Sequence, residues 1–124
     1  MIKLLLLFTL LFSSASYAKW TKVSASDSNT YYIDVGKVKK KDGYVYYWEL
    51  SDYLKLDKWK RMSSKSLMEG DCNIPRKARE IYVNYYSQPM GIGLASMSSS
   101  EKQDWHHSVP NSALERMLNF ACIM

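Results

Sequence analysis

From Trp20 onward the chain alternates hydrophobic and polar residues with a period of two, and polar turn residues interrupt the alternation about every ten positions. This pattern predicts a set of short antiparallel strands. Asp42-Gly43 separates two of them, and this dipeptide favours a type I′ hairpin because both central residues need positive φ. The alternation predicts about six strands, from the segments 20–24, 30–34, 38–41 with 44–50, 63–72, 79–86 and 91–97.

Two of these segments carry further expectations. In 79–86 we expect Ile81, Val83 and Tyr85 to share one face, because side chains two apart on a strand point the same way. The glycines Gly91 and Gly93 indicate a bulge or a close backbone approach in the last segment.

After the polar stretch 98–101 the period changes to that of a helix. Ser112-Ala113-Leu114-Glu115 fits a capping box, in which the serine hydroxyl and the glutamate three residues later satisfy unpaired backbone N–H groups. The spacing predicts a C-terminal helix whose apolar stripe packs on one face of the sheet. The stripe consists of Leu114, Met117, Leu118, Ala121 and Cys122.

The first eighteen residues have the pattern of a cleaved signal peptide. Lys3 precedes an apolar run from Leu4 to Phe12, and Ser16-Tyr17-Ala18 fits the small-x-Ala cleavage site. We therefore expect a signal peptide at 1–18 and one exported domain at 19–124. The apolar run is about half the length that a bilayer span requires, so no transmembrane segment is predicted.

The chain contains two cysteines, Cys72 and Cys122. Exported proteins meet an oxidising compartment, where an even number of cysteines usually forms disulfides. We predict a Cys72–Cys122 disulfide that joins the last turn of the helix to the end of a strand.

The composition fits a small packed domain of mildly basic character. Of the 124 residues, 10 are Tyr and 4 are Trp, and the net charge is +5. This charge favours acidic glycans, membrane surfaces or acidic proteins as partners, or serves solubility alone. An exported protein does not meet nucleic acid as a usual partner, so none is expected.

The order of several aromatic and turn motifs, together with the two cysteines, resembles the bacterial surface-adhesin protein E-like family. Asn111 departs from the glycine that many members carry before the capping serine. No cysteine follows the expected cleavage site, so no lipid anchor is predicted. The motifs are Trp20; Tyr31-Tyr32-Ile33-Asp34; Val45 to Trp48 followed by Asp52-Tyr53; Ser64-Lys65 and Asp71-Cys72; Met90-Gly91-x-Gly93; Trp105; Val109-Pro110-x-Ser112; and Cys122.

The resemblance implies an α+β fold, with a single curved antiparallel β-sheet of about six strands and a C-terminal α-helix packed on one face and tethered by the disulfide. It also implies a Gram-negative protein in the periplasm or at the cell outer membrane. The best understood relatives bind host extracellular-matrix or plasma proteins. The expected function is therefore a binding module that is not an enzyme and needs no cofactor.

Candidate chemistry is sparse in the sequence. The histidines, His106 and His107, are adjacent, and neighbouring side chains on an extended segment point to opposite sides. On a loop they could join Asp104 in a metal or haem site, which makes a periplasmic small-molecule or metal-binding protein the alternative function. Glu69 and Asp71 share a strand face and match a glycosidase dyad in residue type only.

The candidate partner-binding residues lie in a basic segment next to aromatic side chains. Aromatic residues supply contact area and positive charge speeds encounter, so this segment fits a surface for an acidic protein or glycan. A second basic segment comprises Lys37, Lys39, Lys40 and Lys41. Lysines on exposed strands also prevent edge-to-edge aggregation, whereas an unprotected edge favours a homodimer. The candidate residues are Lys55, Lys58, Trp59, Lys60 and Arg61.

Overall fold

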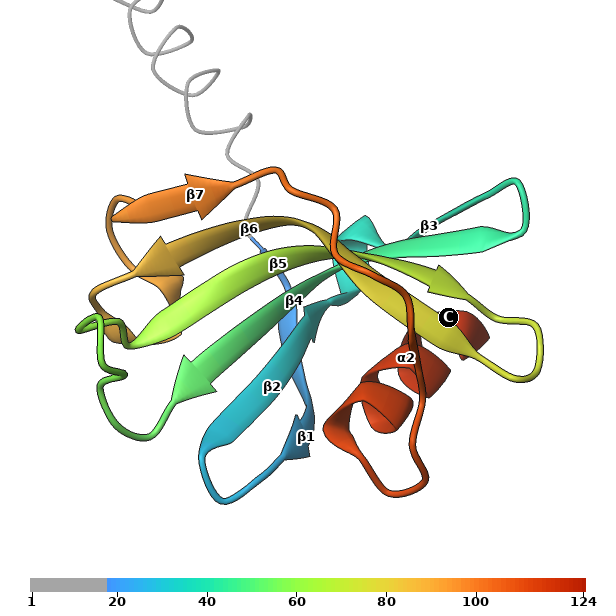
Figure 1. The fold of residues 1–124 in the computed structure, drawn as a ribbon, viewed down its shortest axis with the longest axis horizontal. Helices are drawn as coiled ribbons and strands as arrows, with labels where there is room; N and C mark the ends of the chain where they lie inside the picture. Colours follow the sequence, from blue (N-terminus) through green and yellow to red (C-terminus); the bar gives the residue numbers. More distant parts are fainter. Residues whose placement is uncertain (1–17) are drawn as a thin grey trace, which may run out of the picture.

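The computed structural model describes residues 18–124, so the predicted signal peptide lies outside the described residues except for Ala18. One antiparallel sheet and one helix, α2 (Ala113–Ile123), form the domain (Figure 1). Two 3₁₀ turns, η1 (Val35–Lys37) and η2 (Pro89–Gly91), interrupt the chain between strands. The strands are β1 (Trp20–Ala25), β2 (Asn29–Asp34), β3 (Lys39–Lys41), β4 (Tyr44–Tyr53), β5 (Ser63–Asp71), β6 (Lys77–Tyr86), β7 (Met97–Ser99) and β8 (His106–His107).

Six strands follow one another across the sheet in the order β1-β2-β4-β5-β6-β7, and two short strands extend its borders. β3 pairs with the first residues of β4, and β2 pairs with the last ones, so the two strands share one border of β4. In the same way β7 and β8 share the outer border of β6. The predicted fold, a single antiparallel sheet with a tethered C-terminal helix, is confirmed.

The predicted hairpin around Asp42-Gly43 is confirmed. Both residues have positive φ, 54° and 85°, as a type I′ turn requires. The turn joins β3 to β4 in the register Lys41↔Tyr44.

One local prediction is wrong. The segment 91–97 is not a strand, because the chain first turns at η2, where Met90 and Gly91 have φ values of 59° and 62°. The Gly91 N–H donates to the buried hydroxyl of Ser63 at 2.8 Å, which fixes η2 over β4 and β5 and delays the strand to Met97. Ile81 is the extra residue of a β-bulge, where the period of two is interrupted, so its sharing a face with Val83 and Tyr85 stays a prediction.

The helix packs on one face of the sheet as predicted. The Ser112 hydroxyl accepts a hydrogen bond from the Glu115 N–H at 3.1 Å, and Glu115 Oε1 accepts one from the Asn111 N–H. Asn111 has φ 65°, a conformation that asparagine and glycine adopt at low cost. Buried residues from both layers form the core, namely Ile33, Val45, Tyr47, Met68, Ala78, Met117, Leu118 and Ala121.

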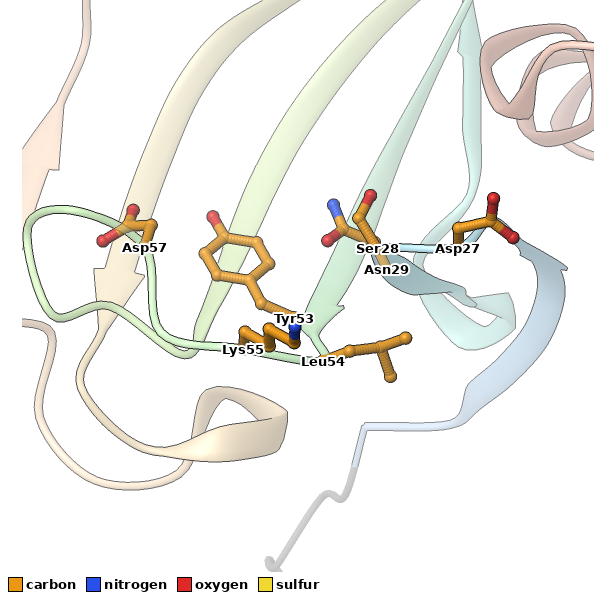
Figure 2. Close-up of a pocket in the computed structure, with 7 residues that line it drawn as sticks. All are labelled: Asp27, Ser28, Asn29, Tyr53, Leu54, Lys55 and Asp57. Atoms are coloured by element: carbon orange, nitrogen blue, oxygen red, sulfur yellow. The ribbon is translucent and has the colours of Figure 1, made fainter.

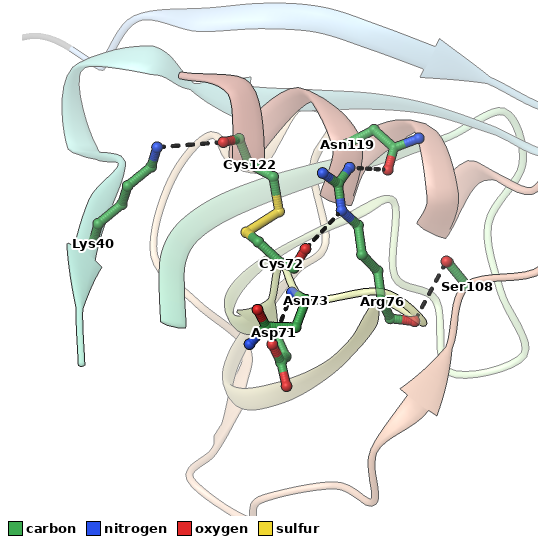
Figure 3. Close-up of a disulfide and its surroundings, with 8 residues drawn as sticks. All are labelled: Lys40, Asp71, Cys72, Asn73, Arg76, Ser108, Asn119 and Cys122. Atoms are coloured by element: carbon green, nitrogen blue, oxygen red, sulfur yellow. Dashed lines mark hydrogen bonds between the residues drawn. A yellow bond between two sulfur atoms is a disulfide. The ribbon is translucent and has the colours of Figure 1, made fainter. Parts of the chain in front are cut away.

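The predicted Cys72–Cys122 disulfide is present, with 5.8 Å between the two Cα atoms (Figure 3). Arg76 strengthens the same junction, because its Nε donates to the Cys72 carbonyl at 3.1 Å and its Nη1 donates to Asn119 Oδ1 at 2.6 Å. Lys40 Nζ donates to the Cys122 carbonyl at 3.3 Å. The end of the helix is therefore held by one covalent bond and by side chains from two other segments.

Candidate functional site

Antiparallel pairing brings three connections to one end of the sheet, which we call the loop end. They are the β1–β2 turn (26–28), the β4–β5 loop (54–62) and the β6–β7 connection (87–96). All five predicted partner-binding residues lie in the β4–β5 loop. The structure therefore places them on one protruding segment.

Asp57 organises this loop. Its Oδ1 accepts the N–H groups of Trp59 and Arg61, each at 2.9 Å, and its Oδ2 accepts Arg61 Nε at 2.6 Å. Burial acts against ionisation, but the bonds from Arg61 and Trp59 outweigh it and lower the pKa of Asp57. The carboxylate thus remains charged and fixes the turn.

Trp59 stands out from the turn between two cations. Lys58 Nζ lies 4.2 Å from the centre of the indole ring, and the Arg61 guanidinium lies 4.5 Å from it. The same guanidinium lies 3.8 Å from the ring of Tyr85 on β6. Arg61 therefore holds the loop against the sheet, whereas Lys55, Lys58 and Lys60 are exposed.

Large apolar side chains are unusually exposed at the loop end. Leu54, Leu56 and Trp59 expose 59%, 58% and 62% of their surfaces, and Leu94 on the β6–β7 connection exposes 94%. Exposed apolar side chains gathered in one region are typical of interaction surfaces. The alternation of Leu54, Leu56 and Trp59 with lysines was visible in the sequence, but their exposure was not.

A cavity of about 580 Å³ opens beside the loop (Figure 2). Of the predicted residues, Lys55 alone contributes to its lining. The lining residues come from the β1–β2 turn, the first residue of β2, the last residue of β4 and the β4–β5 loop, and they are Asp27, Ser28, Asn29, Tyr53, Leu54, Lys55 and Asp57.

The second basic segment is not part of this surface. Lys39–Lys41 form β3, which pairs with Tyr44–Tyr46 at the start of β4, whereas the loop follows Tyr53 at its end. A strand of this length spans roughly 30 Å, so the two groups of lysines form separate surfaces.

His106 and His107 form β8 at the border of β6, opposite Ala78 and Lys77, and both are exposed. Within residues 18–124, no three His, Cys, Asp or Glu side chains are grouped to hold a metal ion. No observation favours the metal-binding alternative, which stays a prediction.

Glu69 and Asp71 do not face each other as a free pair of carboxylates. Tyr46 donates to Glu69 Oε2 at 2.6 Å, and Arg79 Nε donates to Glu69 Oε1 at 2.7 Å. Burial opposes ionisation of Glu69, but these two bonds outweigh it and lower its pKa. Asp71 accepts the Asn73 N–H at 3.0 Å, so both groups have structural partners.

The family of the chain follows from its sequence. The model of surface-adhesin protein E matches residues 20–123 of the 124. The chain belongs to the surface-adhesin protein E family. Membership supports a surface adhesin that is exported or displayed at the surface. No curated protein and no solved structure matched the chain.

In the described part of this adhesin, no helix combines the length and the hydrophobicity that crossing a membrane would require.

Proposed function

We propose that this protein is a non-catalytic adhesin module that binds a host extracellular-matrix or plasma protein through the loop end. One observation carries the proposal, namely that Asp57 fixes the β4–β5 loop with Trp59 exposed at its tip. A rigid, exposed aromatic side chain loses little entropy on binding and is a frequent energetic centre of protein interfaces.

The charges of the loop fit an acidic partner. Arg61 neutralises Asp57 through their ion pair, which leaves Lys55, Lys58 and Lys60 as uncompensated cations around the tip. Rim lysines of this kind accelerate association with a negatively charged surface more than they increase affinity. Leu54 and Leu56 would add apolar contact area once the partner excludes water.

Binding to immobilised basement-membrane extract and to plasma fractions tests this proposal. A Trp59→Ser variant should lose most of its binding through faster dissociation, and a Lys55→Ser, Lys58→Ser, Lys60→Ser variant should associate more slowly. Arg61 is kept, because its loss would release the loop. The charge-matched control replaces Lys22, Lys41 and Lys102, which are exposed outside the loop.

Wild-type binding that both loop variants retain would contradict the role of the loop end. Protease treatment of intact cells tests the location. Cleavage of the protein at the surface supports access to host proteins, whereas complete protection supports a periplasmic location and contradicts the host-facing role.

A further inference from the structure

The face of the sheet opposite α2 carries a groove that is separate from the loop end. Its hollow has a volume of about 250 Å³ and is lined by Lys37, Lys39, Tyr46, Trp48 and Leu67. The strand register places Trp48 beside Leu67 and Leu67 beside Tyr82, so apolar side chains form a row across β4, β5 and β6. We call this region the aromatic groove.

Other segments cover the sheet on both sides of this row. η2 packs over the end of β4, where Leu50 is fully buried. At the start of β4, Trp105 stacks on Tyr44 with 5.9 Å between the ring centres. The aromatic groove is thus an uncovered strip between two covered regions.

The floor of the groove is rigid and nearly neutral. The Tyr46 hydroxyl donates to Glu69, which also accepts Arg79 Nε, so the tyrosine ring is fixed and the carboxylate is neutralised. Arg79 is fixed in turn, because its guanidinium lies 4.4 Å from the ring of Trp105. Trp48 meets Tyr82 edge to face, with 6.1 Å between the ring centres. These contacts exist without a ligand, so binding needs little ordering of the floor.

The border of the groove is cationic. Lys37 and Lys39 are exposed, and neither forms an ion pair with any of residues 18–124. Lys39 lies opposite Tyr46 in the β3–β4 register, so its side chain shares the face of the aromatic floor. A ligand with one apolar face and one negative group complements this arrangement.

We propose that the aromatic groove binds a uronate-containing polysaccharide. The C–H face of a sugar ring stacks on Trp48, and its carboxylate lies near Lys37 and Lys39. The hollow is slightly smaller than the roughly 300–1,000 Å³ of drug-sized sites, which suits one or two sugar rings rather than a folded partner. This site is distinct from the loop end and does not depend on the proposed function.

Calorimetric titration with defined oligosaccharides tests the proposal. Hexasaccharides of hyaluronan and of heparin should bind, because both contain uronate, whereas a neutral dextran hexasaccharide should not. Trp48→Leu should weaken binding about tenfold, and Lys39→Gln should weaken it about threefold and reduce its dependence on salt. Lys40→Gln is the matched control, because it removes the same charge from the same strand on the opposite face.

Two further measurements keep the result interpretable. Thermal unfolding followed by circular dichroism verifies that Trp48→Leu folds, and a Lys37→Gln, Lys39→Gln variant tests the groove if it does not. Single-stranded oligothymidylate serves as a polyanion without sugar acids.

The proposal is overturned if neither acidic hexasaccharide binds at millimolar concentration, or if oligothymidylate binds as well as heparin. Equal losses with Lys40→Gln and Lys39→Gln would also overturn it, since they would indicate nonspecific attraction. Loop-end variants should bind the hexasaccharides normally, so the failure of either proposal can be recognised separately.

Discussion

Leu118 of α2 lies directly over Gly70 of β5. A Cβ atom at Gly70 would come within 2.5 Å of Leu118 Cδ1 and 2.9 Å of Val45 Cγ1. Glycine at this strand position therefore allows the helix to approach the sheet closely. Gly70→Ala should lower the free energy of unfolding by about 1–3 kcal/mol, because buried side chains must shift to accept the methyl group.

Urea denaturation of the wild type and of Gly70→Ala measures this change. Gly36→Ala is the control, since the nearest atom to an added Cβ there lies 3.5 Å away. It should alter stability by less than about 0.5 kcal/mol. Equal stability of Gly70→Ala and wild type would show that the helix does not approach β5 this closely.

Removal of the disulfide should destabilise the domain strongly. The bond closes a loop across a sequence separation of 50 residues, and in the chain-entropy model such a loop contributes about 4 kcal/mol. Urea denaturation of a Cys72→Ser, Cys122→Ser variant measures the loss. Reductant should shift the midpoint of the wild type and leave that of the variant unchanged. Two reactive thiols in unfolded, unreduced wild type would disprove the bond.

Glu49 should make stability depend on pH. The pKa of Glu49 is raised from 4.5 to about 7. Burial of the carboxyl group is the larger cause, and the negative charge of Glu80 is the smaller one. The folded protein therefore binds this proton more tightly than the unfolded chain. The contribution of Glu49 to the free energy of unfolding is therefore full below about pH 4.5, declines as the pH rises towards 7 and is lost above that value. The free energy of unfolding should fall by about 1–3 kcal/mol across this range.

Urea denaturation at several pH values between 4 and 8 measures the decline. Glu49→Gln should flatten the profile, because the amide cannot ionise. Glu101→Gln removes an exposed carboxyl and should leave the profile as it is in the wild type. A wild-type profile that rises across this range would contradict the raised pKa.

The hydroxyl of Tyr47 should be dispensable for stability. The side chain is fully buried, and the hydroxyl finds no hydrogen-bond partner among residues 18–124. Tyr47→Phe removes an unsatisfied polar group. It should increase the free energy of unfolding by about 1 kcal/mol and so raise the melting temperature. Tyr46→Phe is the contrasting variant and should lower it, because the Tyr46 hydroxyl donates to Glu69 at 2.6 Å. A lower melting temperature for Tyr47→Phe would indicate a partner for its hydroxyl.

Local signals predicted most elements because their causes are local. The hairpin depends on the backbone freedom of Asp42 and Gly43, and the helix start depends on the cap at Ser112. The failure at 91–97 has a long-range cause, since η2 is held by the hydroxyl of Ser63, a residue 28 positions away. No local pattern reports such a bond.

The same distinction applies to the candidate sites. Tyr44, Tyr46 and Trp48 alternate along β4, and this alternation could have indicated an aromatic outer face. The covered regions beside that face come from Trp105 and η2, which are distant in the sequence. Only the strand register shows that they leave the aromatic groove open between them.

The sequence by itself determined the strand and helix periods, the hairpin, the cap and the pairing of the two cysteines, because each depends on neighbouring residues or on the number of thiols. Tertiary structure decided that Gly70 admits Leu118, that Arg61 fixes the loop through Asp57, and that the two groups of lysines lie at opposite ends of β4. These relationships arise when strands pair and layers pack. They join residues that are distant in the sequence, so the residues next to each position do not indicate which side chain it will contact.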